Sequence, residues 1–358
     1  MKILAFDIGT GTKDVLLYDS ERKLENCIKM VLTSPTVVHA GQIESLSENL
    51  FLDGHIVGGG PLVHACLRHL KKGHKVVFSL RAASAVKNER SRVEEMGFTV
   101  GDNPGYRTIH LDELQLDRFY EFLRPLGEDP ATIDGLCLAV QDHGKAEGGT
   151  TDRSFRFDTF VEHLKRDPSL DVFIYTPETL PDCFMRMHCA LEYFKEHSPD
   201  KKIVMMDTCM AALKGSLLVC PEVKGPVAIL NCGNSHSMGA VIRENRILAL
   251  FEHHTKILKK NPQRYVHYVT GLAAGTISSE EIFREDGEGA FIFEKVGVDA
   301  IEAFFYTGPR RGLLDGLSFP FRCKPQIATP GGDMMMTGTV GLVDAFRKAH
   351  RLDLPLTV

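Results

Sequence analysis

Short apolar runs alternate with helical patterns along the whole chain, which predicts an α/β protein. Near the N-terminus, ILAFDIG and DVLLYD flank a Gly/Thr turn and predict a hairpin, and LENCIKMVL follows as a third strand. PLVHACLRHLKKG has Pro at its first turn and Gly at its end, which predicts a helix. AASAVKNERSRVEEMG predicts another helix. Further strands are expected at KVVFSL, GLCLAV, DVFIYT and KKIVMMD, with helices at FDTFVEHLKRD and FMRMHCALEYFKEH.

The strand–turn–strand pattern of the N-terminus starts again near Gly225, in GPVAILNCGNSHSMGAVIRENRILALFEHHT. At an offset of 224 residues, Asp7 aligns with Asn231 and Gly9 with Gly233. Such an internal repeat predicts two domains of one type that face each other, with a ligand held between their turns.

We therefore expect an N-terminal domain of residues 1–219 plus 334–358, with a segment of about 55–200 inserted into it. A shorter second domain would comprise residues 220–333. A chain of 358 residues is also longer than one hydrophobic core usually serves.

Composition excludes several classes of protein. The net charge is −5, so no basic excess is available for nucleic acid or an anionic membrane. The first apolar run contains Asp7, so no signal peptide is expected. The nine cysteines form no CxxC pair, which is typical of reduced thiols in a cytoplasmic protein. The most apolar stretch, from Ile203, is interrupted by Asp207 and Lys214 and indicates a buried strand and a helix.

The first turn carries candidate phosphate-binding chemistry in Asp7, Gly9, Thr10, Gly11, Thr12 and Lys13. Glycines let backbone N–H groups approach an anion, and Asp7 at a strand end is placed to hold Mg²⁺ beside phosphates. The alternative is a plain hairpin turn with a capping Asp. No GxxxxGK[ST] motif occurs, and the turn leads into a strand, unlike a GxGxxG nucleotide motif.

DIGTGTKDVLLYD resembles the first phosphate motif of the superfamily of actin, heat-shock chaperones, and sugar and acetate kinases. The strings ILNCGNSHSMGAVI, VMMDTCMAALKGSLL and TPGGDMMMTGTVGLVDAF resemble its second phosphate motif, its connecting segment and its closing glycine-rich stretch. The resemblance implies two facing ribonuclease-H-like domains with ATP and Mg²⁺ in the cleft between them. It adds these nucleotide-binding candidates: Asn231, Gly233, Asn234, Ser235, His236, Gly331 and Gly332.

More narrowly, VGGGP, AVQDHG, MDTCMAALKGS, NCGNSHSMGA, FEHHT and GGDMMMTGTVGL resemble an uncharacterised family found largely in archaea and anaerobes. Its members often carry the label pyruvate formate-lyase activating enzyme. Radical chemistry of that kind needs three closely spaced cysteines, and this sequence has no CxxxCxxC motif.

Two positions depart from, or refine, the superfamily pattern. Asn231 stands where many members have Asp, so Mg²⁺ would depend more on Asp7. Asp207 follows an apolar strand and begins a helix, so it is either the N-cap of that helix or a general base that orients the attacking group, or both.

Histidines suggest a second site. Asp142 and His143 follow a strand, His236 lies in the second turn, and Glu252, His253 and His254 end a third strand beside that turn. Neighbouring strand residues point to opposite faces, so only one of His253 and His254 would join His236 and His143 in a transition-metal site. The alternative is that the imidazoles bind phosphate or cap strand ends.

Gly59 and Gly60 lead into a helix start that can bind an anionic group of a second substrate, or form only a tight loop. Together these features predict an ATP/Mg²⁺-dependent phosphotransferase or ATPase that acts on a small molecule, with Asp7 and Asp207 as catalytic candidates. Two alternatives stay open: a nucleotide-dependent switch that regulates a partner enzyme, and a metallo-transferase or hydrolase built on the histidines. Besides the nucleotide and the small molecule, the expected partners are another protein or a second copy of this chain in a homodimer.

Overall fold

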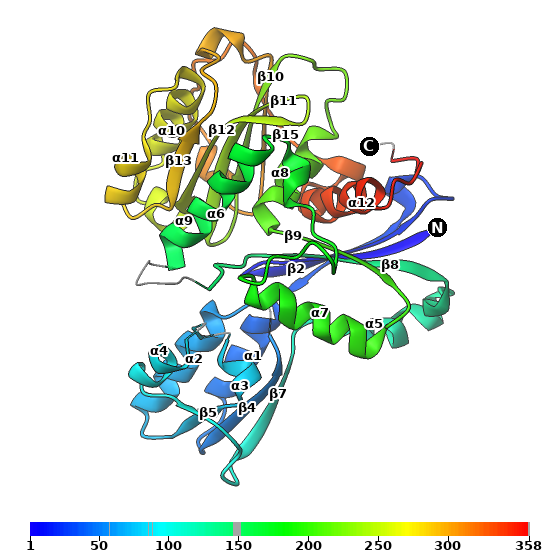
Figure 1. Cartoon of the computed structure of the whole chain (residues 1–358), viewed down its shortest axis with the longest axis vertical. Helices are drawn as coiled ribbons and strands as arrows, with labels where there is room; N and C mark the ends of the chain where they lie inside the picture. Colours follow the sequence, from blue (N-terminus) through cyan, green and yellow to red (C-terminus); the bar gives the residue numbers. More distant parts are fainter. Residues whose placement is uncertain (57, 85, 88, 146–151, 357–358) are drawn as a thin grey trace.

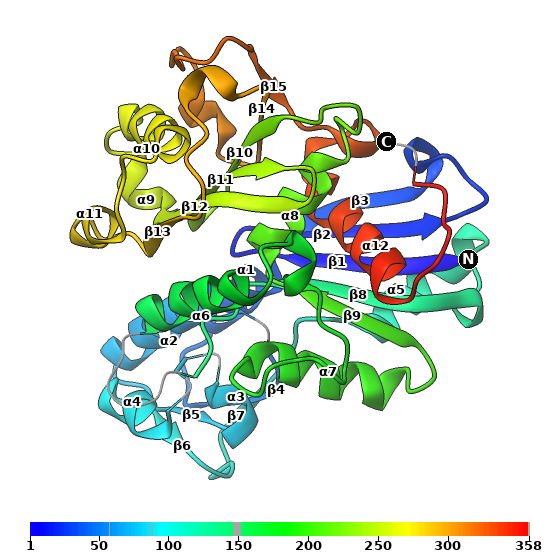
Figure 2. The same ribbon diagram turned by 45° about the horizontal axis from the view of Figure 1, so that its top comes forward.

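The computed structural model describes residues 1–356 except 57, 85, 88 and 146–151, and shows an α/β protein with separate β-sheets (Figure 1). The first sheet has the strand order β3-β2-β1-β8-β9, visible side by side in Figure 2. Its strands are β1 (Lys2–Ile8), β2 (Thr12–Asp19), β3 (Ile28–Thr33), β8 (Ile133–Val140) and β9 (Lys202–Met206). β1, β2 and β3 are antiparallel neighbours, whereas β8 and β9 run parallel to β1.

The second sheet repeats this arrangement and adds one edge strand, in the order β13-β12-β11-β10-β14-β15. Its strands are β10 (Pro226–Cys232), β11 (His236–Arg243), β12 (Arg246–His254), β13 (Gly289–Ile292), β14 (Ala303–Thr307) and β15 (Pro325–Ile327). β10, β11 and β12 are antiparallel, and β14 and β15 run parallel to β10. Two sheets with this strand order are ribonuclease-H-like, so the predicted fold class is confirmed.

The two hairpins correspond in the position of their strands along the sequence as well as in topology. Adding 224 to the bounds of β1 and β2 gives the bounds of β10 and β11. The registers also correspond, because Asp7 lies opposite Asp14 in the first hairpin and Asn231 lies opposite Met238 in the second. The weak repeat seen in the sequence is therefore a repeat of structure.

A third, smaller sheet of parallel strands in the order β6-β5-β4-β7 forms the lobe at the bottom of Figure 1. Its strands are β4 (Leu50–His55), β5 (Val76–Phe78), β6 (Thr99–Val100) and β7 (Arg107–Asp112). Its helices are α1 (Pro35–Glu44), α2 (Gly60–Lys71), α3 (Leu80–Ala83) and α4 (Arg90–Glu95). These elements share a separate hydrophobic core.

Two local predictions were wrong. The single helix expected over AASAVKNERSRVEEMG is instead the end of α3 followed by α4, and the Ser84 hydroxyl donates to the Arg81 carbonyl, competing with helix continuation. Residues 85 and 88 of that prediction lie outside the described residues. The run DVFIYT is not a strand: its start is a 3-10 helix (Leu170–Phe173) capped by the Ser169 side chain, and only Tyr175 bridges to β9.

The remaining helices cover the faces of the two large sheets. They are α5 (Leu116–Leu123), α6 (Asp152–Arg166), α7 (Met185–His197), α8 (Thr208–Leu217), α9 (Thr255–Leu258), α10 (Gln263–Ala274), α11 (Ser279–Arg284) and α12 (Thr337–Ala349). α5 and α7 pack on one face of the first sheet, and α10 packs on the second sheet. α8 and α12 lie between the two sheets (Figure 1), in a core that both sheets share.

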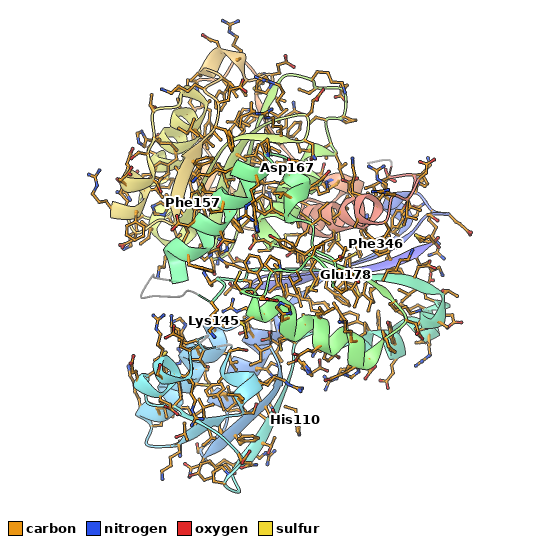
Figure 3. All side chains as sticks on the ribbon, viewed as in Figure 1. His110, Lys145, Phe157, Asp167, Glu178 and Phe346 are labelled. Carbon is orange, nitrogen blue, oxygen red and sulfur yellow. The ribbon has the colours of Figure 1, made fainter. Side chains whose placement is uncertain are left out.

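Glycines let α8 and α12 approach closely where they cross. A Cβ on Gly215 would lie 1.9 Å from the carbonyl oxygen of Thr337, and a Cβ on Gly341 would lie 2.0 Å from that of Ala211. Gly135 of β8 likewise leaves room for the ring of Phe346 (labelled in Figure 3). This tight crossing fixes the start of α12 against the end of β1. No helix in the described part of the chain is long and apolar enough to cross a membrane.

Candidate active site

A cavity of about 510 Å³ lies where both large sheets and the small lobe meet. It is within the range of 300–1,000 Å³ that is common for small-molecule sites. Residues of both turns line it, together with the starts of α2, α8 and α12. The sequence-predicted residues at its wall are Asp7, Gly9, Thr10, Thr12, Gly59, Gly60, Asp142, His143, Asn231, Gly233, Asn234, Ser235, His236 and His254.

The two Gly-containing turns meet tip to tip at this cavity. Each is closed in the same way: the Gly9 N–H donates to the Thr12 carbonyl at 2.9 Å, and the Gly233 N–H donates to the His236 carbonyl at 3.0 Å. The hydroxyls of Thr10 and Ser235 lie 2.7 Å apart and join one turn to the other. Hydroxyl groups from both repeats therefore converge on one place.

Asp7 and Asp14 place two buried carboxyl groups at the wall of the cavity. Asp7 accepts a hydrogen bond from the Thr208 hydroxyl at 2.6 Å, and Asp14 Oδ1 is buried without a hydrogen-bond partner among the described residues. Burial raises the pKa of Asp7 to about 7; the bond from Thr208 opposes this rise and repulsion from Asp207 adds to it. Burial, with repulsion from Asp7, raises the pKa of Asp14 to about 8.

These raised pKa values mean that negative charge at this point is poorly compensated by the protein itself. A divalent cation would compensate it, and hard carboxylate oxygens are the ligands that Mg²⁺ prefers. The orphaned oxygen of Asp14 is thus an observation that fits a cation. Asp14 was missed in the sequence, although its position opposite Asp7 in the predicted hairpin offered a signal.

Asp207 does not reach the cavity. One carboxylate oxygen accepts from the Cys209 N–H at 2.9 Å and caps α8, and the other accepts from Arg156 at 2.7 Å. Arg156 of α6 also pairs with Glu252 of β12, and all three side chains are buried. With both oxygens occupied and no lining position, Asp207 is an N-cap and ion-pair partner here, and the geometry does not support the general-base role.

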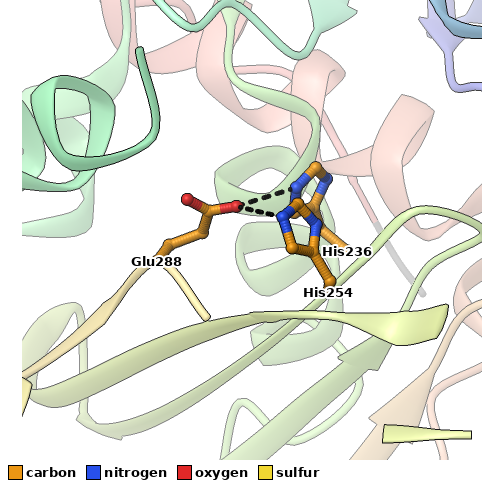
Figure 4. Close-up of side chains that lie close together, drawn as sticks. All are labelled: His236, His254 and Glu288. Atoms are coloured by element: carbon orange, nitrogen blue, oxygen red, sulfur yellow. Dashed lines mark hydrogen bonds and ion pairs between the residues drawn. The ribbon is translucent and has the colours of Figure 1, made fainter. Parts of the chain in front are cut away.

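The side chains at the histidine-rich end of β12 point to two different faces of the strand. His253 is buried and stacks on Tyr268, with ring centroids 5.5 Å apart, away from the cavity. His254 lies opposite His236 in the register, at the cavity wall. Glu252 pairs with Arg156 instead of joining the histidines. The carboxylate that does join them is Glu288, as Figure 4 shows, and no sequence pattern pointed to it.

Asp142 and His143 lie in the loop after β8. The Asp142 carboxylate accepts from the backbone N–H groups of Gly144, Arg186 and Met187 at 2.7–3.0 Å, so it holds the loop to the start of α7. The His143 ring lies 5.9 Å from that of His236, and its Nδ1 is buried without a partner among the described residues. Arg186, also missed in the sequence, brings a positive charge to the cavity wall.

Four predicted nucleotide-binding residues do not line the cavity. The Lys13 ammonium is buried and donates to the carbonyls of Glu113 and Leu114. Gly11 packs against the Asn234 side chain, where a Cβ would lie 2.4 Å from Nδ2. Gly331 and Gly332 are not at the cavity wall. The residues that follow them in the chain and do line the cavity are Met334, Met335, Thr337 and Gly338. The even-numbered side of β2 supplies Thr12 and Asp14, which is why Lys13 points to the other face.

At the lower wall, Gly58, Gly59 and Gly60 precede and begin α2. Gly60 lies against the first turn, since a Cβ there would be 3.7 Å from the Thr10 methyl carbon. The Leu62 N–H in the first turn of α2 donates to the Thr36 hydroxyl, and the positive dipole end of the helix points to the same cavity as both turns.

Known structures offer distant likenesses over nearly the whole chain. The activator of the 2-hydroxyisocaproyl-CoA dehydratase from Clostridium difficile with bound ADPNP is 10% identical, with 99% of this chain and 98% of that chain covered and a TM-score of 0.38. A PilM-PilN type IV pilus biogenesis complex is 10% identical, with coverage of 97% and 98% and a TM-score of 0.40.

A Bacteroides thetaiotaomicron protein with actin-like ATPase fold and unknown function is 9% identical, with 94% of each chain covered and a TM-score of 0.38. The fold assignment rests on the strand order described above.

No curated protein matches the sequence. A family model does match: residues 57–313, well over half of the chain, fit the family described as "Putative pyruvate format-lyase activating enzyme (DUF1786)". The chain therefore belongs to this family, as its sequence strings predicted.

Proposed function

We propose that the protein binds ATP with Mg²⁺ in the cavity between its two ribonuclease-H-like sheets and uses it for phosphoryl transfer to a small molecule or for hydrolysis. The observation that carries the proposal is the convergence of two equivalent turns, through the Thr10–Ser235 contact of 2.7 Å, beside two carboxyl groups that lack a compensating charge. One turn would belong to residues 1–219 plus 334–358 and the other to 220–333, so the predicted domain division is part of this proposal.

Asp7 and Asp14 are the proposed Mg²⁺-binding residues. When bound, Mg²⁺ would neutralise phosphate charge and polarise the phosphoryl group that is transferred. Thr208 orients Asp7 through its hydroxyl, and Asn231, at the equivalent place in the second repeat, supplies a neutral amide at the cavity wall. Most of the charge offered to the cation thus comes from the first repeat.

The phosphates would lie between the two turns. Thr10, Thr12 and Ser235 offer hydroxyl donors, and Gly9 and Gly233 let the backbone approach closely. Arg186 at the wall is a fixed positive charge for the phosphate farthest from the base. Such preorganised donors stabilise the charge that develops on the transferred group.

The base and the acceptor would occupy opposite ends of the cavity. Gly308, Pro309, Met334 and Met335 form an apolar end beside the second repeat, which suits a stacked base. The start of α2, with Thr36 and His64 nearby, forms a polar end that suits an anionic small molecule. Both carboxylate oxygens of Asp207 already accept hydrogen bonds, one from the Cys209 N–H of α8 and one from Arg156. The reactivity of the acceptor would therefore come chiefly from its orientation beside the phosphates and from the charges around it.

An assay of ADP formation tests the proposal. Wild type is incubated with ATP and Mg²⁺, alone and with pools of carboxylates and alcohols, and compared with Asp14→Asn, which keeps the shape of the side chain. We expect ADP formation by wild type and at least a tenfold loss in the variant. Folded wild type that forms no ADP in any pool would overturn the catalytic part of the proposal.

A further inference from the structure

Two imidazoles and one carboxylate meet at the wall of the cavity. His236 is the first residue of β11, His254 is the last of β12, and they are direct neighbours across the two strands. Glu288 immediately precedes β13, the next strand of the same sheet. Figure 4 shows the Glu288 carboxylate pointing toward both rings.

The spacing of these side chains matches that of a metal's ligands. Glu288 Oε1 lies 3.1 Å from Nε2 of His236 and 3.3 Å from Nε2 of His254. One ligand atom from each residue lies within 4.8 Å of the other two. Ligands about 2.0–2.1 Å from Zn²⁺ at the corners of a tetrahedron are about 3.3 Å apart, so both carboxylate–imidazole separations match such a site.

The surroundings hold His236 in an orientation that suits a ligand. Its Nδ1 faces the side-chain amide of Gln141, 2.7 Å from Nε2 and 3.0 Å from Oε1. When Nδ1–H donates to Oε1 of Gln141, Nε2 carries the lone pair that a metal requires. A hydrogen bond from the other ring nitrogen to an oxygen is usual for a metal-bound histidine.

The fourth direction is open to the cavity. His236, His254 and Glu288 all contribute to its wall, next to Gly233 and Ser235 of the second turn. Three protein ligands with one open position are characteristic of catalytic metal sites, whereas structural sites are closed by a fourth protein ligand.

We propose that His236, His254 and Glu288 bind a divalent transition-metal ion, such as Zn²⁺ or Fe²⁺, with its open coordination position facing the cavity. The open position would take water or an oxygen of a bound phosphate or carboxylate. His143 stands beside it with an unpartnered, buried Nδ1, placed to hydrogen-bond that oxygen ligand. The site is separate from the Mg²⁺ proposed at Asp7 and Asp14 and does not require nucleotide.

Titration with Co²⁺, followed by visible absorption, tests this proposal without any activity assay. The protein is first stripped of metal with a chelator, and the chelator is then removed. It should bind one equivalent of Co²⁺ and give the d–d bands of a low-symmetry site with nitrogen and oxygen ligands. Zn²⁺ should displace the Co²⁺ and abolish the bands. Elemental analysis of protein as purified, before stripping, measures which metal it acquires.

Matched variants locate the site. Loss of an outer partner of a metal ligand commonly costs 10–100-fold in affinity, so we expect at least about 100-fold weaker Co²⁺ binding for His254→Ala and Glu288→Gln, and about 10–100-fold for Gln141→Ala. Asp7→Ala is the control: it should retain Co²⁺ binding and lose Mg²⁺·ATP binding. The two proposals therefore fail independently of each other.

Glu288→Gln preserves the size of the side chain, so it guards against a folding defect in His254→Ala, and circular dichroism checks both. No Co²⁺ binding by folded wild type would overturn the proposal and leave two imidazoles that simply donate to one carboxylate. Binding that survives in both His254→Ala and Glu288→Gln would overturn it as well, because the metal would then lie elsewhere.

Discussion

Gly338 lies in the first turn of α12, directly against the carboxylate that we assign to Mg²⁺. A Cβ at this position would be 1.9 Å from Asp7 Oδ2 and 2.7 Å from Asp7 Cγ. Ordinary contact begins at 3.4 Å, so Gly338→Ala requires the carboxylate or the helix to retreat by about 1.5 Å. Because the start of α12 is fixed by its tight crossing with α8, we expect Asp7 to move.

The expected cost has two parts. Overpacking a buried contact typically costs about 1–3 kcal/mol, which outweighs the gain of about 0.5–1 kcal/mol that alanine brings to a helix. The shift also breaks the 2.6 Å hydrogen bond from Thr208. A displaced ligand should weaken Mg²⁺·ATP binding at least 10–100-fold, the range known for losses of outer partners.

Gly41 provides the control, since it lies in α1 and a Cβ there meets nothing within 4 Å. Gly41→Ala should therefore gain about 0.5–1 kcal/mol in helix propensity and leave nucleotide binding unchanged. Urea unfolding measures the stability of each variant, and calorimetric titration measures the affinity. Wild-type affinity in Gly338→Ala would refute the assignment of Asp7.

Two further predictions concern buried charge. Without divalent cations, the free energy of unfolding should fall as pH rises from about 4 to about 7, because an acid whose pKa is raised on folding binds its proton more tightly in the folded state. Asp7→Asn should flatten this pH dependence. Urea unfolding in EDTA at pH 5 and pH 8 measures the change. Arg156→Met should cost about 3–5 kcal/mol, since Asp207 and Glu252 would stay buried without their cation. Arg22→Met removes a half-exposed cation that pairs with Asp19 and Glu128, and Glu128 keeps Lys2 as a partner, so it should cost no more than about 1 kcal/mol in the same assay. Equal losses for the two variants would contradict the reasoning.

The strand–turn–strand units were predictable because the signals that form them are local. Buried strands such as β1 and β10 are nearly continuous apolar runs, and the glycines after them allow the tight turns. The two hairpins have the same register at an offset of 224 residues. The weak sequence repeat was therefore enough to predict that Asp7 and Asn231 lie at equivalent strand ends.

The remainder of the site depends on contacts between distant segments, which no local pattern records. Glu288 lies in a loop before a short edge strand, and only the pairing of β13 with β12 brings it to the histidines. Arg156 has the sequence context of an exposed helical residue, yet it is buried between Asp207 and Glu252. Lys13 was assigned to phosphate by its place in the motif, whereas strand alternation turns it toward Glu113 and Leu114.

Calorimetric titration of metal-stripped protein with a non-hydrolysable ATP analogue and Mg²⁺ is the most direct test of the account. We expect micromolar, Mg²⁺-dependent binding by wild type and by Gly41→Ala, and at least about 100-fold weaker binding by Asp7→Ala. An absence of binding to folded wild type, or equal affinity in Asp7→Ala, would contradict the assignment of this cavity to Mg²⁺·ATP.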